Sequence, residues 1–145
     1  MAQFPTILLA EDDQNDAFLL KMALSKAGVA IPITHVLNGQ EALRYLAGEG
    51  IFSDRANYPL PCLLITDLKM GKFSVFDLLA RAKPILESEN LPAIVLSASG
   101  ADSDKQRALD LGARAYYVKP SDLDALIALA CELKASWLCP VTQQA

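Results

Sequence analysis

The sequence has few of the residues that build metal–thiolate sites or disulfide frameworks. Its 145 residues include one histidine and three cysteines, Cys62, Cys131 and Cys139. The cysteines are odd in number and none belongs to a Cys-x-x-Cys pair. We therefore interpret Cys62 and Cys131 as buried, reduced thiols and expect a cytoplasmic protein without a zinc or disulfide scaffold.

Long apolar runs and an excess of basic charge are also missing. No stretch approaches the roughly 18 apolar residues of a membrane span, and a net charge of −4 disfavours nucleic acid or an anionic membrane as the main partner. Residues 1–5 contain no basic residue and no long apolar run, so we expect no secretory signal. With 52% apolar and 21% charged residues, we predict one globular domain over 1–145, with a core of about 5–137 and a tail of 138–145.

Five short apolar segments predict strands. They are continuous rather than alternating, which is typical of a parallel sheet covered on both faces. The segments are 6–10, 31–36, 62–66, 93–97 and 115–118.

Helical patterns lie between the strands. The spacing of Ala17, Leu20, Leu24 and Ala27 predicts a helix over about 13–27, closed by Gly28. Two further helices are predicted over 40–47 and over 75–87, the second with a kink or boundary at Pro84. A fourth is predicted from a Ser103–Gln106 capping box to Gly112. A fifth begins at Ser121, and its apolar stripe is Leu123, Ile127, Ala130, Leu133 and Trp137. Five strands alternating with five helices predict an α/β fold, a (βα)5 doubly wound parallel sheet with the flavodoxin-like order 2-1-3-4-5.

The connection over 48–61 is longer than the usual link between a helix and a strand. It contains turn-forming residues together with Phe52, Tyr58, Pro59 and Pro61. Because connections of this length are uncommon in compact domains, we interpret it as a candidate functional segment.

Polar residues follow the predicted strands where a ligand would bind in this architecture. Glu11, Asp12 and Asp13 follow the first strand and Asp67 follows the third, whose ends form the topological switch point. Ser97 ends the fourth strand, and Lys119 follows the fifth. Clustered carboxylates favour a hard cation such as Mg²⁺, and acids, a metal, a hydroxyl and an ammonium around one aspartate are typical of phosphoryl transfer. The sequence thus predicts Asp67 as a nucleophile that forms an acyl phosphate.

Each of these residues has a plainer explanation when it is taken alone. Asp12 or Asp13 can cap the first helix, Asp67 a turn, Ser97 can be a loop hydroxyl, and Lys119 a solvated surface lysine. Four polar groups at the ends of four strands are a stronger signal than any one of them. His35, the single histidine, is predicted on the far side from the acids, as a surface residue or a satisfied core residue.

Four motifs carry a resemblance to the CheY-like receiver family of two-component response regulators. They are Ile7-Leu-Leu-Ala-Glu11-Asp12-Asp13, Leu64-Ile-Thr-Asp67-Leu-Lys-Met70, Val95-Leu-Ser97-Ala98 and Tyr116-Tyr-Val-Lys119-Pro120. Their order and spacing are similar to the family's over about residues 5–137. The extended loop before the third strand resembles that of stand-alone regulators paired with phytochrome-type or hybrid kinases.

The resemblance implies a role for each site residue. Asp67 is the phosphoacceptor, and Mg²⁺ is held by Asp12, Asp67 and the Lys69 backbone carbonyl, with Glu11 acting through water. Ser97, Tyr116 and Lys119 form the phosphoryl-binding and switch set.

The resemblance also implies partners. A sensor histidine kinase or a phosphotransfer protein supplies the phosphoryl group, and a downstream protein target responds to a conformational switch through protein contacts. A homodimer through the fourth and fifth helices is a further expectation. On this view the chain is a switch with only self-phosphorylation and self-dephosphorylation chemistry, not a turnover enzyme.

One segment departs from the family pattern and leaves alternatives open. Gly71 stands where the family has proline, and Ser74-Val75 stand where it has an Asp-Gly pair. This departure supports a pseudo-receiver, the same fold used as a phosphorylation-independent binding module, whereas the intact acids, Ser97 and Lys119 oppose it. A Mg²⁺-dependent phosphatase with an aspartyl nucleophile is a second alternative, although such enzymes carry the nucleophile after the first strand and have a cap domain.

Overall fold

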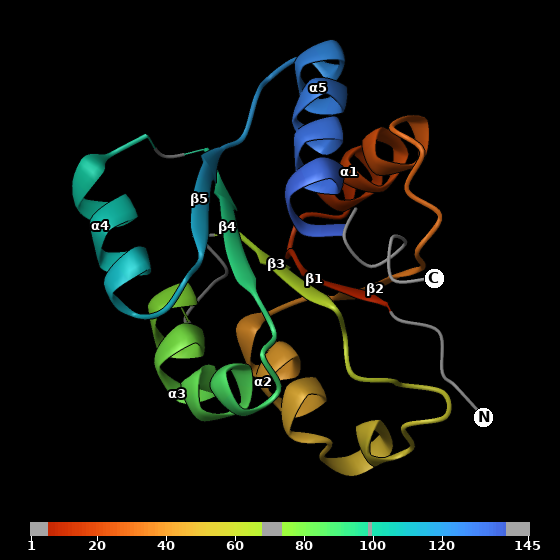
Figure 1. Cartoon of the computed structure of the whole chain (residues 1–145), viewed down its shortest axis with the longest axis vertical. Helices are drawn as coiled ribbons and strands as arrows, with labels where there is room; N and C mark the ends of the chain where they lie inside the picture. The colour runs from red at the N-terminus through yellow and green to blue at the C-terminus, as the bar shows by residue number, and fades with distance from the viewer. Residues whose placement is uncertain (1–5, 68–73, 99, 139–145) are drawn as a thin grey trace.

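The computed structural model describes residues 6–67, 74–98 and 100–138 of the chain. Strands and helices alternate along it, as the sequence predicted (Figure 1). The elements are β1 (Ile7–Ala10), α1 (Gln14–Lys26), β2 (Ile33–Val36), α2 (Gly39–Ala47), the 3-10 turn η1 (Gly50–Ser53), β3 (Leu63–Thr66), α3 (Val75–Ser88), β4 (Ala93–Ser97), α4 (Asp102–Asp110), β5 (Ala115–Val118), α5 (Leu123–Leu133) and the π-helical segment η2 (Lys134–Leu138).

The strands form one parallel sheet in the predicted order, β2-β1-β3-β4-β5. Helices cover both faces, with α1 and α5 on one and α2, α3 and α4 on the other (Figure 1). Alternate strand residues serve the two layers: Leu8 and Leu64 pack toward α2 and α3, while Leu9 and Ile65 pack toward α1 and α5. The flavodoxin-like prediction is therefore confirmed.

The edge strands are less buried than the sequence predicted. β1, β3 and β4 are buried along their whole length, whereas β2 and β5 are mostly half-buried. An edge strand has a neighbour on one side only, so part of its surface remains in contact with solvent. The apolar character of these two segments did not distinguish an edge from a central position.

The helix boundaries follow the predicted signals at most ends. Asp13 caps α1 by accepting a hydrogen bond from the Asp16 amide at 3.0 Å, and Gly28 follows the helix with a φ of 91°, a conformation that glycine adopts without strain. The structure gives α3 as one helix that continues through Pro84 to Ser88, so this proline marks no boundary.

Three local predictions are wrong. α4 begins at Asp102, so Ser103 lies inside the helix, and Gln106 reaches forward to Asp110 at 2.8 Å instead of forming a capping box. α5 is capped by Asp122, which accepts from the Ala125 amide at 2.8 Å, because its carboxylate lies one residue nearer the helix than the Ser121 hydroxyl. Cys131 is exposed on α5 rather than buried, and Cys62 is half-buried.

The long connection before β3 is itself packed. Phe52 of η1 and Tyr58 contact the buried Tyr45 ring of α2, with ring centroids 5.0 and 6.1 Å from it. The Arg55 guanidinium donates to the carbonyls of Tyr45 and Leu46 at 2.9 and 3.0 Å, which satisfies acceptors at the end of α2. This segment is therefore a folded addition to α2.

The departure from the family pattern before α3 has a structural explanation at two positions. Ser74 caps α3 by accepting from the Asp77 amide at 3.2 Å, the role that an aspartate can also fill. Val75 is completely buried in the core. Gly71 lies outside the described residues.

No helix within the described ranges is long and apolar enough to cross a bilayer.

Candidate functional site

The predicted site residues lie at the carboxyl edge of the sheet. Glu11 follows β1 and Asp67 follows β3, and these strands are neighbours at the centre of the sheet. The Asp67 amide donates to the Ala10 carbonyl at 3.2 Å, so the two acidic segments are joined through the backbone. On the other side, the Lys119 amide donates to the carbonyl of Ser97, the last residue of β4, at 2.6 Å.

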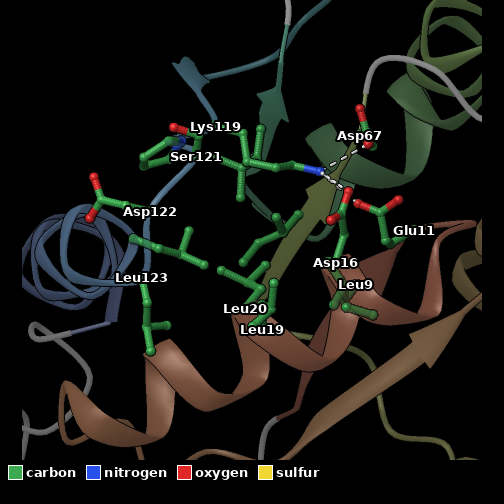
Figure 2. Close-up of a pocket in the computed structure, with 15 residues that line it drawn as sticks. Leu9, Glu11, Asp16, Leu19, Leu20, Asp67, Lys119, Ser121, Asp122 and Leu123 are labelled. Atoms are coloured by element: carbon green, nitrogen blue, oxygen red, sulfur yellow. Dashed lines mark hydrogen bonds and ion pairs between the residues drawn. The ribbon is translucent and has the colours of Figure 1, made fainter.

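Lys119 contacts three carboxylates of the site. Its ammonium lies 2.9 Å from Oε1 of Glu11, 3.1 Å from Oδ2 of Asp67 and 3.2 Å from Oδ2 of Asp16. Figure 2 shows these three acids pointing toward the ammonium from separate parts of the chain. One positive charge is thus shared by three carboxylates.

Asp16 is the residue that the sequence analysis missed. It lies in the first turn of α1, three residues after the capping Asp13. Among the described residues, carboxylate oxygens of Glu11, Asp16 and Asp67 lie within 4.8 Å of one another, so these acids form a set that can hold a cation. An acid in the first turn of the helix after β1 was the available signal, but such acids also occur simply because they favour the helix dipole.

Burial changes the proton affinities of this cluster. Glu11 is only 4% exposed. Burial of the carboxylate, reinforced by the charge of Asp67, raises its pKa to about 7, although hydrogen bonding to Lys119 acts in the other direction. Burial alone would lower the pKa of Lys119, but its hydrogen bond to Glu11 and the charge of Asp67 outweigh that effect, and the pKa lies above its usual range. Lys119 therefore remains charged in the site.

Apolar side chains line the space beneath the Lys119 stem. A cavity of about 160 Å³ lies between the acidic cluster, α1 and the start of α5 (Figure 2). Its apolar lining is Leu9, Ala17, Leu19, Leu20, Ile65, Leu96, Leu123 and Leu126. Because such a lining provides little solvation, contacts between Lys119 and the acids are stronger than they would be in open solvent.

The structure locates the other predicted residues as follows. Ser97 is buried at the end of β4, and Tyr116 is half-buried on β5, where it packs against the core layer beneath α4. Asp12 is exposed and does not belong to the cluster of three carboxylates. Lys69 lies outside the described residues.

The predicted location of His35 is wrong. This half-buried residue of β2 pairs in register with Leu9, and its Nε2 lies 2.7 Å from the Glu11 backbone carbonyl. A carbonyl accepts only, so Nε2 carries the proton and donates. The side chain therefore supports the acidic segment directly. The interpretation of His35 as a residue whose polar group is hydrogen-bonded fits this geometry. The partner in that hydrogen bond could not be identified from sequence spacing alone.

Comparison with known proteins identifies the family. The model of the response regulator receiver domain matches residues 7–130. The chain belongs to this family. Receiver domains are signalling switches of two-component systems, and the fold and the motif order of this receiver agree with that assignment.

Several solved receivers are similar over nearly the whole chain. Response regulator RPA3017, described in red-light signalling of R. palustris, has a TM-score of 0.86 and 27% identity, covering 93% of this chain and 94% of that one. The phosphorylated cyanobacterial phytochrome response regulator RcpA has a TM-score of 0.83 and 29% identity, with the same two coverages. The Mn²⁺-bound form of response regulator Rcp1 has a TM-score of 0.80 and 25% identity, covering 92% and 94%.

Some curated relatives are much longer. The transcriptional regulator NtrC of Bradyrhizobium is 36% identical over 125 residues, but this receiver spans only 23% of its length. The DNA-binding activity in the name of that regulator is therefore a property of the longer protein and is not assigned to this chain.

The pKa of Glu11 gives the metal-free receiver a specific pH dependence. An unfolded Glu11 titrates near 4.5 and the folded one near 7, so the folded state holds the proton more tightly. Its contribution to the unfolding free energy is complete below the unfolded pKa and is lost as pH rises through the folded pKa. From pH 5 to pH 8, we expect the unfolding free energy of the wild type to fall by about 2–3 kcal/mol relative to Glu11→Gln.

Urea unfolding in EDTA at several pH values measures this difference. Glu132→Gln, at an exposed position of α5, serves as the control and should follow the wild type at every pH. Parallel pH curves for the wild type and Glu11→Gln would show that Glu11 does not titrate in this window.

Proposed function

We propose that this receiver accepts a phosphoryl group on Asp67 from a sensor histidine kinase or a phosphotransfer protein, and that it signals through protein contacts. The observation that supports this most directly is the Lys119 ammonium, 3.1 Å from Asp67 at the carboxyl edge of the central strand. A half-buried cation beside a carboxylate nucleophile can stabilise the negative charge of an incoming phosphoryl group.

The proposed reaction transfers one phosphoryl group between two side chains. A carboxylate oxygen of Asp67 attacks phosphorus and forms an O–P bond, while the N–P bond of the donor phosphohistidine breaks. The electron pair of that bond goes to the imidazole nitrogen of the donor, and Asp67 becomes a mixed anhydride. Attack of water on phosphorus later releases inorganic phosphate and restores the carboxylate, with the loss of one proton to solvent.

The acidic cluster fits a magnesium ion. When Glu11 is ionised, three carboxylates within 4.8 Å of one another carry two more negative charges than Lys119 neutralises, and hard oxygen ligands suit Mg²⁺. We propose Asp12, Asp67 and the Lys69 carbonyl as ligands, with Glu11 acting through water. When bound, the ion supplies positive charge to the phosphoryl oxygens. The Mn²⁺-bound form of the similar Rcp1 supports a divalent-cation site in this receiver.

Ser97 and Tyr116 are the proposed switch residues. The Ser97 carbonyl accepts a backbone hydrogen bond from Lys119. Tyr116 lies on the neighbouring strand β5, where it pairs in register with Val95, two residues before Ser97. We propose that the Ser97 hydroxyl turns to a phosphoryl oxygen and that the Tyr116 ring follows it. The surface formed by α4, β5 and α5 would then change for a downstream protein target, and a homodimer through α4 and α5 would use the same surface. We also propose that the receiver acts in the cytoplasm as a single-domain switch over residues 1–145.

Intact mass spectrometry tests the proposed function. After incubation with acetyl phosphate and Mg²⁺, we expect the mass of one phosphoryl group to be added, and no addition in EDTA. The modified sample should also show shifted amide NMR signals for Ser97 and Tyr116. A folded protein that gains no mass when the product is trapped quickly would contradict the proposal and favour the phosphorylation-independent binding module.

A further inference from the structure

The site contains an acid that is neither a proposed metal ligand nor a proposed contact of the phosphoryl group. Asp16 lies on α1, whereas Glu11 and Asp67 follow the two central strands. Its carboxylate lies 3.2 Å from the Lys119 ammonium. Asp16 therefore contacts the proposed phosphoryl-binding lysine from a separate helix (Figure 2).

The ammonium group sets a limit on the number of partners. A protonated lysine has three N–H donors, and Lys119 has three carboxylate partners at 2.9, 3.1 and 3.2 Å. All of its donors are thus used before any phosphoryl group arrives. A phosphoryl oxygen on Asp67 can gain a hydrogen bond from Lys119 only if one carboxylate gives it up.

Asp16 is the acid that loses least by giving up this contact. The side chain of Glu11 is 5% exposed and that of Asp67 is 14% exposed, whereas that of Asp16 is 42% exposed. A carboxylate that keeps access to water is readily solvated after it leaves its partner, but a buried one is left with an uncompensated charge. Asp67 itself remains attached to the incoming group.

We propose that Asp16 is a positioning residue that holds Lys119 in the unphosphorylated receiver and exchanges its place for a phosphoryl oxygen. This inference rests on the proposed phosphorylation of Asp67. The Asp16 carboxylate competes with the phosphoryl group for one donor and repels an anionic donor molecule. It therefore slows phosphoryl uptake and connects the start of α1 to the occupancy of the site.

The variant Asp16→Asn tests the exchange. The amide keeps the size of the side chain but removes its charge, so it holds a Lys119 donor less tightly and a phosphoryl oxygen takes that donor more easily. With acetyl phosphate at saturating Mg²⁺, we expect the uptake rate constant, measured by intact mass, to increase about three- to tenfold, which corresponds to about 0.7–1.4 kcal/mol. Glu132→Gln, which removes one exposed acid from α5, should remain within twofold of the wild type.

A spectroscopic measurement separates positioning from a general charge effect. In the unphosphorylated protein, the Lys119 ammonium proton signal should exchange with water faster in Asp16→Asn than in the wild type, because one of its three acceptors is weakened. Glu132→Gln should leave that exchange unchanged. Faster uptake together with faster exchange supports the inference.

The outcomes that overturn the inference are distinct from those that overturn the proposed function. If the wild type takes up phosphoryl but Asp16→Asn does so at the same rate or more slowly, the inference fails and the proposed function stands. A slower variant that also needs more than about fivefold higher Mg²⁺ would assign Asp16 to the metal instead. If the wild type takes up no phosphoryl group at all, both fail together.

Discussion

Replacing Asp67 by asparagine should abolish phosphoryl uptake and stabilise the metal-free receiver. An amide oxygen is too weak a nucleophile to form the anhydride, so the gain of mass on incubation with acetyl phosphate should disappear. The expected gain in stability follows from the charge of the cluster, where three carboxylates face the single ammonium of Lys119. Removing one of the acids relieves repulsion, and we expect an increase of about 1 kcal/mol in the unfolding free energy.

Two measurements on the same protein preparation check this prediction. Intact mass gives phosphoryl uptake, and urea unfolding in EDTA at pH 8 gives the unfolding free energy. Asp110→Asn on α4 is a suitable control, because it removes an exposed acid outside the cluster and should leave uptake unchanged. Uptake retained by Asp67→Asn would place the phosphoryl group on another residue, and a loss of stability would mean that repulsion does not dominate the cluster.

The fold was predictable because its main signals are local. Each strand needs only a short apolar run, and each helix needs a periodic pattern with an end signal such as a capping side chain or a terminating glycine. Parallel strands joined through helices then leave one dominant topology. Errors at helix starts arose where two residues compete for one role, as with Asp122 and Ser121 at the start of α5. Such competition is decided by backbone geometry at the level of a single residue.

The site was predictable only as far as strand ends determine it. Glu11, Asp67, Ser97 and Lys119 follow strands, so the topology alone brings them to one edge of the sheet. Asp16 reaches the same lysine from a helix, and this depends on how α1 packs against the sheet. Sequence spacing does not give the direction of that packing.

The contact made by His35 could not be predicted from the sequence either. Its strand was predicted, but its hydrogen bond to the Glu11 carbonyl depends on the register between β1 and β2. A shift of one residue in a strand moves every side chain to the opposite face. The support that it gives to the acidic segment therefore became visible only when the register was known.

Replacing Lys119 by methionine should have the opposite effect on stability from Asp67→Asn. Methionine preserves much of the stem that covers the apolar cavity but removes the charge, so three carboxylates remain close together without their ammonium partner. Removing one partner from a buried ion pair is strongly destabilising because the remaining charge is uncompensated. We expect the unfolding free energy in EDTA at pH 8 to fall by about 3 kcal/mol.

The loss of unfolding free energy in Lys119→Met should become smaller whenever negative charge at the site is removed or neutralised. Lowering the pH to 5 protonates Glu11, whose pKa is about 7, and should restore much of the stability. Millimolar Mg²⁺ should do the same by binding to the cluster of acids and neutralising part of its charge. The double variant Lys119→Met/Asp67→Asn should lose less than Lys119→Met alone, because one of the mutually repelling acids is gone. Lys105→Met, at an exposed position of α4, controls for the loss of a surface lysine. A loss of stability in Lys119→Met that neither pH, nor Mg²⁺, nor the second substitution changes would mean that Lys119 stabilises the receiver through packing of its stem and not through its charge.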